Sequence, residues 1–166
     1  MQNHEPIIRL IETRDNPHVK KLVQETLAEF GISGEGFAGV DPELDDMCVA
    51  YGDDLSAYYV IEVEGKILGA GGYAPLEGTV RGTTAELRKM YFRPELRGLG
   101  LGQKMIEKCI KEATRLGFEN IYLETVPKMK AAQGLYLKNG FAYLTSPMGN
   151  TGHTGCGVRM LRPLYE

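Results

Sequence analysis

The stretch RGLGLG, residues 97–102, decides the fold of this chain because it separates two segments with different hydrophobic periods. Before it, residues 83–93 (TTAELRKMYFR) are typical of a β-strand. After it, apolar residues recur at every third or fourth position until Gly117, which is typical of an amphipathic helix. Such a junction exposes the first backbone N–H groups of the helix, which have no partner within the helix. We therefore expect the loop to bind an anion, and a phosphate group in particular.

The glycines of this loop let phosphate oxygens approach the backbone closely, and Arg97 adds a positive charge. A flexible turn that binds nothing is the alternative interpretation. The loop does not fit the pattern G-x-x-x-x-G-K-[ST], because Gln103 stands where the second glycine belongs. It also lacks the third glycine of the dinucleotide-binding pattern G-x-G-x-x-G. A diphosphate ligand outside those two families is the interpretation that remains.

The patterning on both sides of the loop predicts alternating strands and helices. Three strand-like runs joined by short turns, which end at the loop, are typical of an antiparallel meander. The expected fold class is α/β, with a sheet of mixed direction in a single domain, residues 1–166. The expected elements are strands at 6–13, 56–64, 67–74, 83–93, 118–126, 141–145 and 155–161, and helices at 16–30, 41–51, 101–116 and 129–139.

Composition excludes several classes of function. The net charge of −3 lacks the basic excess of a nucleic-acid-binding protein, and no apolar run reaches the ~18 residues that span a membrane. Cys48, Cys109 and Cys156 are far apart and form no C-x-x-C pair, so we expect neither a disulfide framework nor a metal site. The H-x-x-C spacing of His153 and Cys156 is only half of a metal site. Free thiols and an N-terminus without an apolar signal segment predict a cytoplasmic protein.

Two separate motifs resemble those of the GNAT superfamily of acetyl-CoA-dependent N-acetyltransferases. RGLGLG matches the loop pattern [Q/R]-x-x-G-x-[G/A], with Arg97, Gly100 and Gly102 at the fixed places. The stretch AQGLYLKNGF, which begins at Ala132, matches the closing-helix pattern A-x-x-L-Y-x-x-x-G-F. The strand ELRKMYF before the loop also resembles the fourth strand of the family, so the likeness covers residues 83 to about 143.

The resemblance implies an acetyl-CoA co-substrate, no metal, and a central sheet, mixed but mostly antiparallel, flanked by helices. The pyrophosphate would be held by backbone N–H groups of the loop, and the pantetheine arm by the strand before it. Many members carry an asparagine where this chain has Met129, so we expect no polar contact there. The cofactor-binding residues implied are Met90, Tyr91, Phe92, Arg97, Gly98, Leu99, Gly100, Leu101, Gly102 and Gln103.

Acetyl transfer to an amine calls for an acid and a base. An alkyl ammonium has a pKa of about 10.4 and must lose a proton before its nitrogen can attack. The departing thiolate is stabilised by a proton donor. By resemblance, Tyr136 is the candidate acid, and a tyrosine that only packs is the alternative. Glu86 is the candidate base, because the histone-acetylating branch has a glutamate at this place. Strand alternation puts Glu86 on the face of Arg88 and Met90, so an ion pair with Arg88 is the alternative interpretation.

The acceptor is an amine of a small molecule or peptide that the sequence does not identify. The family usually varies its acceptor pocket in regions that correspond to the glycine-rich loop 31–39 and the acidic segment 41–46, and the loop 149–155 could border it. We expect His153 in the last of these to be an exposed loop histidine, and the acidic segment to be a solvated helix. The rival function is an acyl-CoA-binding or sensor domain without transfer activity. The oligomeric state stays open, a homodimer included.

Overall fold

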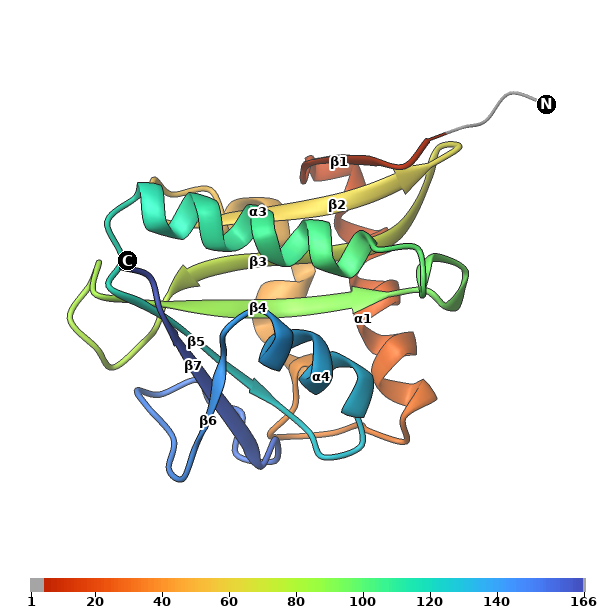
Figure 1. Ribbon diagram of the computed structural model, residues 1–166. Coiled ribbons are helices and arrows are strands. Elements are labelled where there is room, and N and C mark those ends of the chain that lie inside the picture. The colour runs from red at the N-terminus through yellow and green to blue at the C-terminus, as the bar shows by residue number, and fades with distance from the viewer. Residues whose placement is uncertain (1–4, 166) are drawn as a thin grey trace.

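A computed structural model describes residues 5–165 of the chain, and it contains one sheet with helices on both faces (Figure 1). The strand order is β1-β2-β3-β4-β5-β7-β6, in which β4 and β5 are parallel and all other neighbours are antiparallel. The expected mixed, mostly antiparallel sheet and its meander are therefore confirmed. The strands are β1 Ile7–Leu10, β2 Ala57–Val63, β3 Lys66–Pro75, β4 Thr84–Phe92, β5 Asn120–Thr125, β6 Ala142–Leu144 and β7 Val158–Pro163.

Two long helices cover opposite faces of the sheet. The apolar stripe of α3 (Leu101–Arg115) packs with Tyr59 and Ile61 of β2, whereas α1 (Asn16–Glu29) packs with Tyr58 and Val60 from the other face of the same strand. This division follows from strand alternation, which sends successive side chains to opposite faces. The remaining helices are α2 Met47–Ala50 and α4 Lys130–Lys138, and the 3-10 turns are η1 Thr13–Asp15, η2 Ala38–Val40, η3 Pro42–Asp45 and η4 Pro94–Leu96.

The acidic segment 41–51 is not the single helix that its sequence predicts. It forms η3 and then α2, with a break at Asp46, whose backbone has φ −151° and ψ 77°. The Asp46 carboxylate accepts a hydrogen bond from the N–H of Val49 at 3.1 Å and so begins a new helix instead of continuing the old one. The first strand also ends earlier than expected, at Leu10, and the last begins later, at Val158.

A bulge in β4 interrupts the alternation of its side chains. Ala70 of β3 is opposite Tyr91 and Gly72 is opposite Arg88, so two residues of β4 face one residue of β3. Lys89 lies within the bulge with φ +46°, a left-handed conformation that is uncommon for residues other than glycine. Its carbonyl accepts a hydrogen bond from the Tyr58 hydroxyl, 2.7 Å away, which holds the bulge from the interior.

The bulge overturns one expectation about β4. Alternation placed Met90 on the face of Glu86 and Arg88, but Met90 packs in the cluster beneath α3, together with Leu87. The side chain of Lys89 instead lies on the face of Glu86, where it forms ion pairs with Asp41 and Glu43. The extra residue at Lys89 reverses the alternation, so side chains after it point to the opposite face from the one expected.

The parallel pair at the centre of the sheet is short. β4 and β5 pair only from Thr84 to Glu86 against Asn120 to Tyr122, and beyond this point the two strands separate. β5 continues to pair with β7 up to Thr125, so the separation opens between β4 and β5 alone. This fork is the feature of the fold that makes room for a site.

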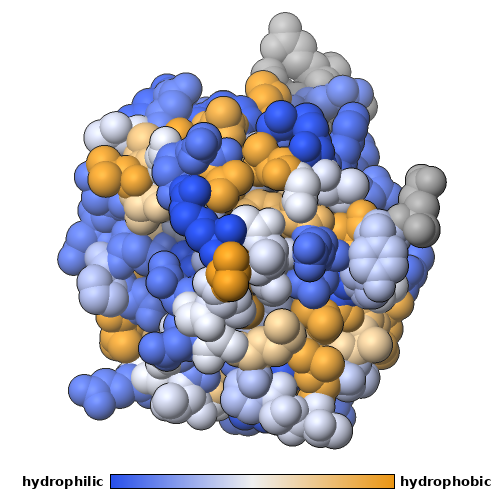
Figure 2. All heavy atoms as spheres, turned by 90° about the vertical axis from the view of Figure 1, so that its left-hand side faces the viewer, coloured by the Kyte–Doolittle hydropathy of each residue, from blue (hydrophilic) through white to orange (hydrophobic). Residues whose placement is uncertain are grey.

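The outer surface has the mixed character of an ordinary globular protein. On the face in Figure 2, hydrophobic side chains lie in small groups between hydrophilic ones. None of the helices within residues 5–165 is long and apolar enough to cross a membrane. The three cysteines are free thiols, and Cys109 of α3 is fully buried in the core.

Candidate functional site

A cleft lies in the fork between β4 and β5, and we call it the inner cleft. Both strands and α4 line it, mainly with apolar side chains. Its walls thus combine the two expected regions, the strand before the glycine loop and the closing helix. The lining residues are Leu27, Phe37, Ala38, Glu86, Leu87, Arg88, Lys89, Met90, Tyr91, Leu123, Glu124, Thr125, Val126, Met129, Ala132, Tyr136, His153 and Cys156.

Tyr136, the candidate acid, lies in the wall of the inner cleft. It comes from α4, is buried, and packs edge-on against Phe141 with ring centroids 5.8 Å apart. Burial raises the pKa of Tyr136 well above its ordinary value, so the phenol keeps its proton at neutral pH. The tyrosine both packs and faces the cleft, and its role as a proton donor stays a prediction.

A second, more polar hollow adjoins the inner cleft, and we call it the outer pocket. The two share Glu86, Arg88, Lys89 and His153 as lining residues. The outer pocket also has charged and polar walls from η3 and from the loops after β3 and β6. Its further lining residues are Asp41, Pro42, Glu43, Glu77, Asn150 and Thr151.

Glu86, the candidate base, stands where the two hollows meet. Its side chain is 5% exposed, and Arg88 Nε donates a hydrogen bond to Glu86 Oε1 at 2.6 Å. Burial raises the pKa of Glu86 above its ordinary value and outweighs the opposing effect of Arg88. The ion pair with Arg88 is therefore confirmed, and Glu86 also lines both hollows, whereas its role as a base stays a prediction.

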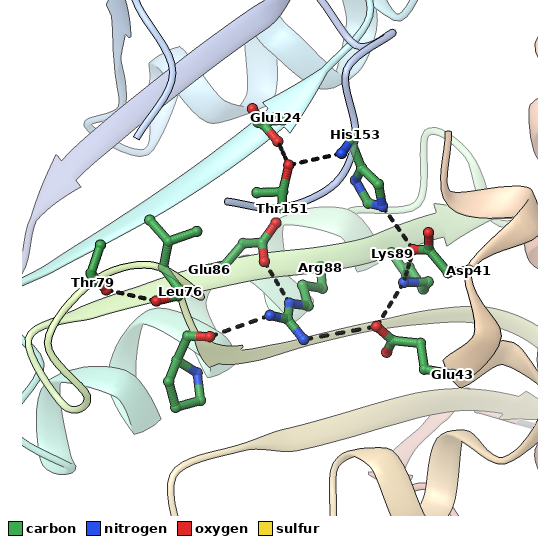
Figure 3. A network of polar contacts seen from close by, with 11 residues as sticks. Asp41, Glu43, Leu76, Thr79, Glu86, Arg88, Lys89, Glu124, Thr151 and His153 are labelled. Carbon is green, nitrogen blue, oxygen red and sulfur yellow. Dashed lines mark hydrogen bonds and ion pairs between the residues drawn. The ribbon is translucent and has the colours of Figure 1, made fainter. Parts of the chain in front are cut away.

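Glu124 of β5 faces Glu86 across the fork, and the sequence analysis missed it. One of its carboxylate oxygens accepts a hydrogen bond from the hydroxyl of Thr151 (Figure 3). The other accepts one from the hydroxyl of Tyr122 at 2.8 Å, so this buried tyrosine orients the carboxylate. The alternation of Tyr122 and Glu124 on one face of β5 was a signal that could have found the pair.

His153 is not the exposed loop histidine that was expected. Its side chain is only 15% exposed, and its Nε2 lies 2.7 Å from the Asp41 carboxylate. Burial alone would lower the pKa of His153, but hydrogen bonds to Asp41 and Cys156 outweigh burial and raise it to about 10. Asp41 also accepts a hydrogen bond from Lys89 Nζ at 2.6 Å (Figure 3). The acidic segment thus begins with a residue of the site rather than with a solvated helix.

Three of these side chains are close enough to hold a metal ion. One ligand atom from each of Glu86, Glu124 and His153 lies within 4.8 Å of the others. One carboxylate oxygen of Glu86 already accepts a hydrogen bond from Arg88, and Nε2 of His153 lies against Asp41. Several of the atoms that could bind a metal are therefore already engaged. The expectation of a metal-free site stays a prediction.

The glycine loop begins α3 with its backbone N–H groups uncovered. Gly98 and Gly100 have φ +80° and +77°, conformations that a Cβ would strain. A Cβ on Gly102 would lie 3.0 Å from Leu135 of α4, so this glycine is required by close packing instead. Within the described chain, no hydrogen bond reaches the N–H groups from Gly98 to Gln103. Uncovered N–H groups at a helix start suit an anion, and the phosphate binding expected of this loop stays a prediction.

Arg97 does not stand free beside this loop. Its guanidinium pairs with the Glu29 carboxylate on α1, donates hydrogen bonds to the Phe92 carbonyl at 2.9 and 3.1 Å, and lies over the ring of Phe30. Met90 and Tyr91 line the inner cleft, whereas the side chain of Phe92 approaches Gly69 and Gly102. Arg97 therefore ties the loop to α1 instead of standing free as the positive charge that was expected beside it.

The family model of the acetyltransferase (GNAT) family matches residues 20–141, which include both strands of the fork, the glycine loop and α4. The chain belongs to this family. The GNAT chain is 39% identical over 160 residues to the uncharacterized N-acetyltransferase YjgM of Escherichia coli K12, covering 96% of this chain and 95% of the relative.

Solved structures of low sequence identity have the same fold. The GNAT-family acetyltransferase of Staphylococcus aureus Mu50 has a TM-score of 0.86 at 20% identity, covering 97% of this chain and 100% of that one. A putative acetyltransferase from Salmonella typhimurium, YncA, solved with its cofactor acetyl-CoA, has a TM-score of 0.72 at 21% identity, covering 98% and 95%. The GNAT chain described here is thus an acetyltransferase, with its hollows at the fork of its sheet.

Proposed function

We propose that this enzyme transfers an acetyl group from acetyl-CoA to a primary amine by direct attack within a ternary complex. The observation that carries the proposal is the junction of the two hollows at Glu86. A mostly apolar cleft in the fork suits a thioester, and the uncovered N–H groups at the start of α3, the helix that follows β4, suit its diphosphate tail. A polar pocket that joins this cleft at a carboxylate suits an amine.

The coenzyme would lie along the fork. Its pyrophosphate would accept hydrogen bonds from the N–H groups of Gly98 to Gln103, and its pantetheine arm would pair with the β4 backbone at Met90 to Phe92, which β5 leaves free on that side. The acetyl-CoA bound to the Salmonella relative supports acetyl-CoA as the co-substrate. The free cysteines favour a cytoplasmic location.

Each proton has an assigned place in the proposed reaction. Glu86 removes a proton from the ammonium group, and its raised pKa makes it a stronger base than an ordinary carboxylate. The neutral amine nitrogen attacks the thioester carbonyl carbon, the carbon–sulfur bond breaks, and the nitrogen loses its second proton to solvent. Tyr136 donates its proton to the departing thiolate and is reprotonated from solvent. The products are the N-acetylated amine and coenzyme A.

The test of this function separates it from the rival, a domain that binds acyl-CoA without transfer. Calorimetric titration should give saturable acetyl-CoA binding to the wild type and to Tyr136→Phe, and weak binding to Gly100→Asp. Release of free thiol with an amine panel should be seen for the wild type and should fall by about 10²–10⁴ in Tyr136→Phe. Binding without thiol release from any amine would favour the rival, and absence of binding at millimolar acetyl-CoA would refute both.

A further inference from the structure

The outer pocket has more negatively charged side chains than positively charged ones. Five carboxylates face three cations, once Glu124 at its inner end is included with the lining residues. This excess of negative charge favours a cationic ligand over a neutral or anionic one. The carboxylates are those of Asp41, Glu43, Glu77, Glu86 and Glu124, and the cations are Arg88, Lys89 and His153.

All three cations already have carboxylate partners. Arg88 Nε donates to Glu86 at 2.6 Å, and Lys89 Nζ lies 2.6 Å from Asp41 and 3.2 Å from Glu43 (Figure 3). His153 shares the Asp41 carboxylate at 2.7 Å. A carboxylate on the acceptor would therefore have to displace a protein carboxylate and leave it unpaired in a partly buried site, which is unfavourable.

Two of the carboxylates have no cationic partner among residues 5–165. Glu124 accepts hydrogen bonds from two neutral hydroxyls, those of Tyr122 and Thr151. Glu77 is exposed at the rim and forms no ion pair, while its carbonyl accepts a hydrogen bond from the N–H of Asn150 at 2.7 Å. Asn150 and Thr151 are adjacent, so the backbone of Glu77 and the carboxylate of Glu124 are bonded to neighbouring residues in one wall of the pocket.

We infer that the acceptor is a diamine or polyamine: an alkyl ammonium with a second cationic group and no carboxylate. This inference rests on the proposed function. The reacting ammonium lies between Glu124 and Glu86, which takes its proton, and the second ammonium lies at the rim beside Glu77. Arg88, Lys89 and His153 already have carboxylate partners and offer no free positive charge to the carboxylate of an amino acid. The pocket therefore disfavours amino acids as acceptors.

Three acceptors of equal length test the inference. 1,4-Diaminobutane, 1-aminobutane and 4-aminobutanoate differ only in the far end, which is cationic, neutral or anionic. Each is incubated with the full-length enzyme and acetyl-CoA, and kcat/KM is measured by thiol release, with the product checked by mass spectrometry. We expect the order diamine, monoamine, amino acid, with about tenfold or more between the first and the last. The preference should shrink in high salt, because the rim is exposed.

Substitution of single carboxylates shows which side chain causes the preference for the diamine. Glu77→Gln should lower kcat/KM for the diamine about two- to fivefold more than it lowers kcat/KM for 1-aminobutane. Glu119→Gln, an exposed carboxylate beside the closed end of the fork, is the matched control and should change neither. Equal or faster acetylation of 4-aminobutanoate would overturn the acceptor class while the proposed function stands. Thiol release with another primary amine but with none of these three would also overturn the acceptor class alone. Intact acetyl-CoA binding with no thiol release from any amine would overturn the proposed function and this inference with it.

Discussion

The ion pair of His153 and Asp41 makes the stability of the fold depend on pH in a defined direction. The pKa of His153 is about 10 in the folded protein, compared with 6.5 for an ordinary histidine. Because the folded value is the higher one, charged His153 stabilises the fold. That contribution is fully present below about pH 6.5 and is lost as the pH rises through about 10.

The size of the effect follows from the two pKa values. Each pH unit between them corresponds to about 1.4 kcal/mol, which sets a ceiling of about 5 kcal/mol on the contribution of the charged imidazole. Lys89 shares the same Asp41 carboxylate at 2.6 Å, and it would compensate part of any loss. We therefore expect a measured difference of about 2–4 kcal/mol between His153→Gln and the wild type at pH 6.

Urea unfolding of both proteins between pH 6 and pH 10.5 measures this difference. The free energy of unfolding of the wild type should exceed that of His153→Gln at pH 6, and the two should converge toward pH 10.5. The imidazole of His153, assigned in NMR spectra by its loss in the variant, should titrate several pH units above 6.5. A pKa of His153 near 6.5, or a stability difference that is constant across the range, would refute the reasoning.

Four further changes have defined outcomes. Glu86→Gln should lower kcat by about 10²–10⁴ without changing the acetyl-CoA Kd, and a loss of affinity of the same size would instead indicate misfolding. Gly102→Val should push against Leu135, cost about 1–3 kcal/mol of stability in urea and weaken acetyl-CoA binding in calorimetry. Met105→Ala should cost about 2–5 kcal/mol, because this side chain is fully buried beneath α3, and a smaller loss in urea would contradict tight packing there. Prolonged treatment with a chelator should leave the acetylation rate unchanged, and restoration of a lost rate by a divalent ion would contradict the metal-free expectation.

The sequence predicted the fold well where local patterns decide it. RGLGLG marks the strand-to-helix junction, whereas the positive φ of Gly98 and Gly100 and the packing of Gly102 against Leu135 are seen only in the structure. The meander and the pairing of Glu86 with Arg88 also follow from strand periodicity. The meander and the Glu86–Arg88 pair could be predicted because each depends on residues that are close together in the sequence.

The parts that could not be predicted depend on long-range contacts. The bulge at Lys89 has no local signal, because lysine is not a residue that favours a positive φ. The partnership of His153 with Asp41 joins residues 112 positions apart, and only the return of the loop 149–155 over the fork brings them together. The boundary at Asp46 was missed because an aspartate suits both the first turn of a helix and its cap.

The fork also gives this sheet an edge in its interior. Beyond Glu86, β4 has no strand partner on its β5 side within residues 5–165, although β5 and β7 continue the sheet further out. An unpaired edge at the rim of a protein invites other chains to pair with it and promotes aggregation. This one is recessed between two strands and beneath α4, where a folded partner does not fit and a thin, amide-bearing chain does. Amide hydrogen exchange in β4 should therefore slow when such a ligand binds, since the ligand completes the sheet in place of a strand.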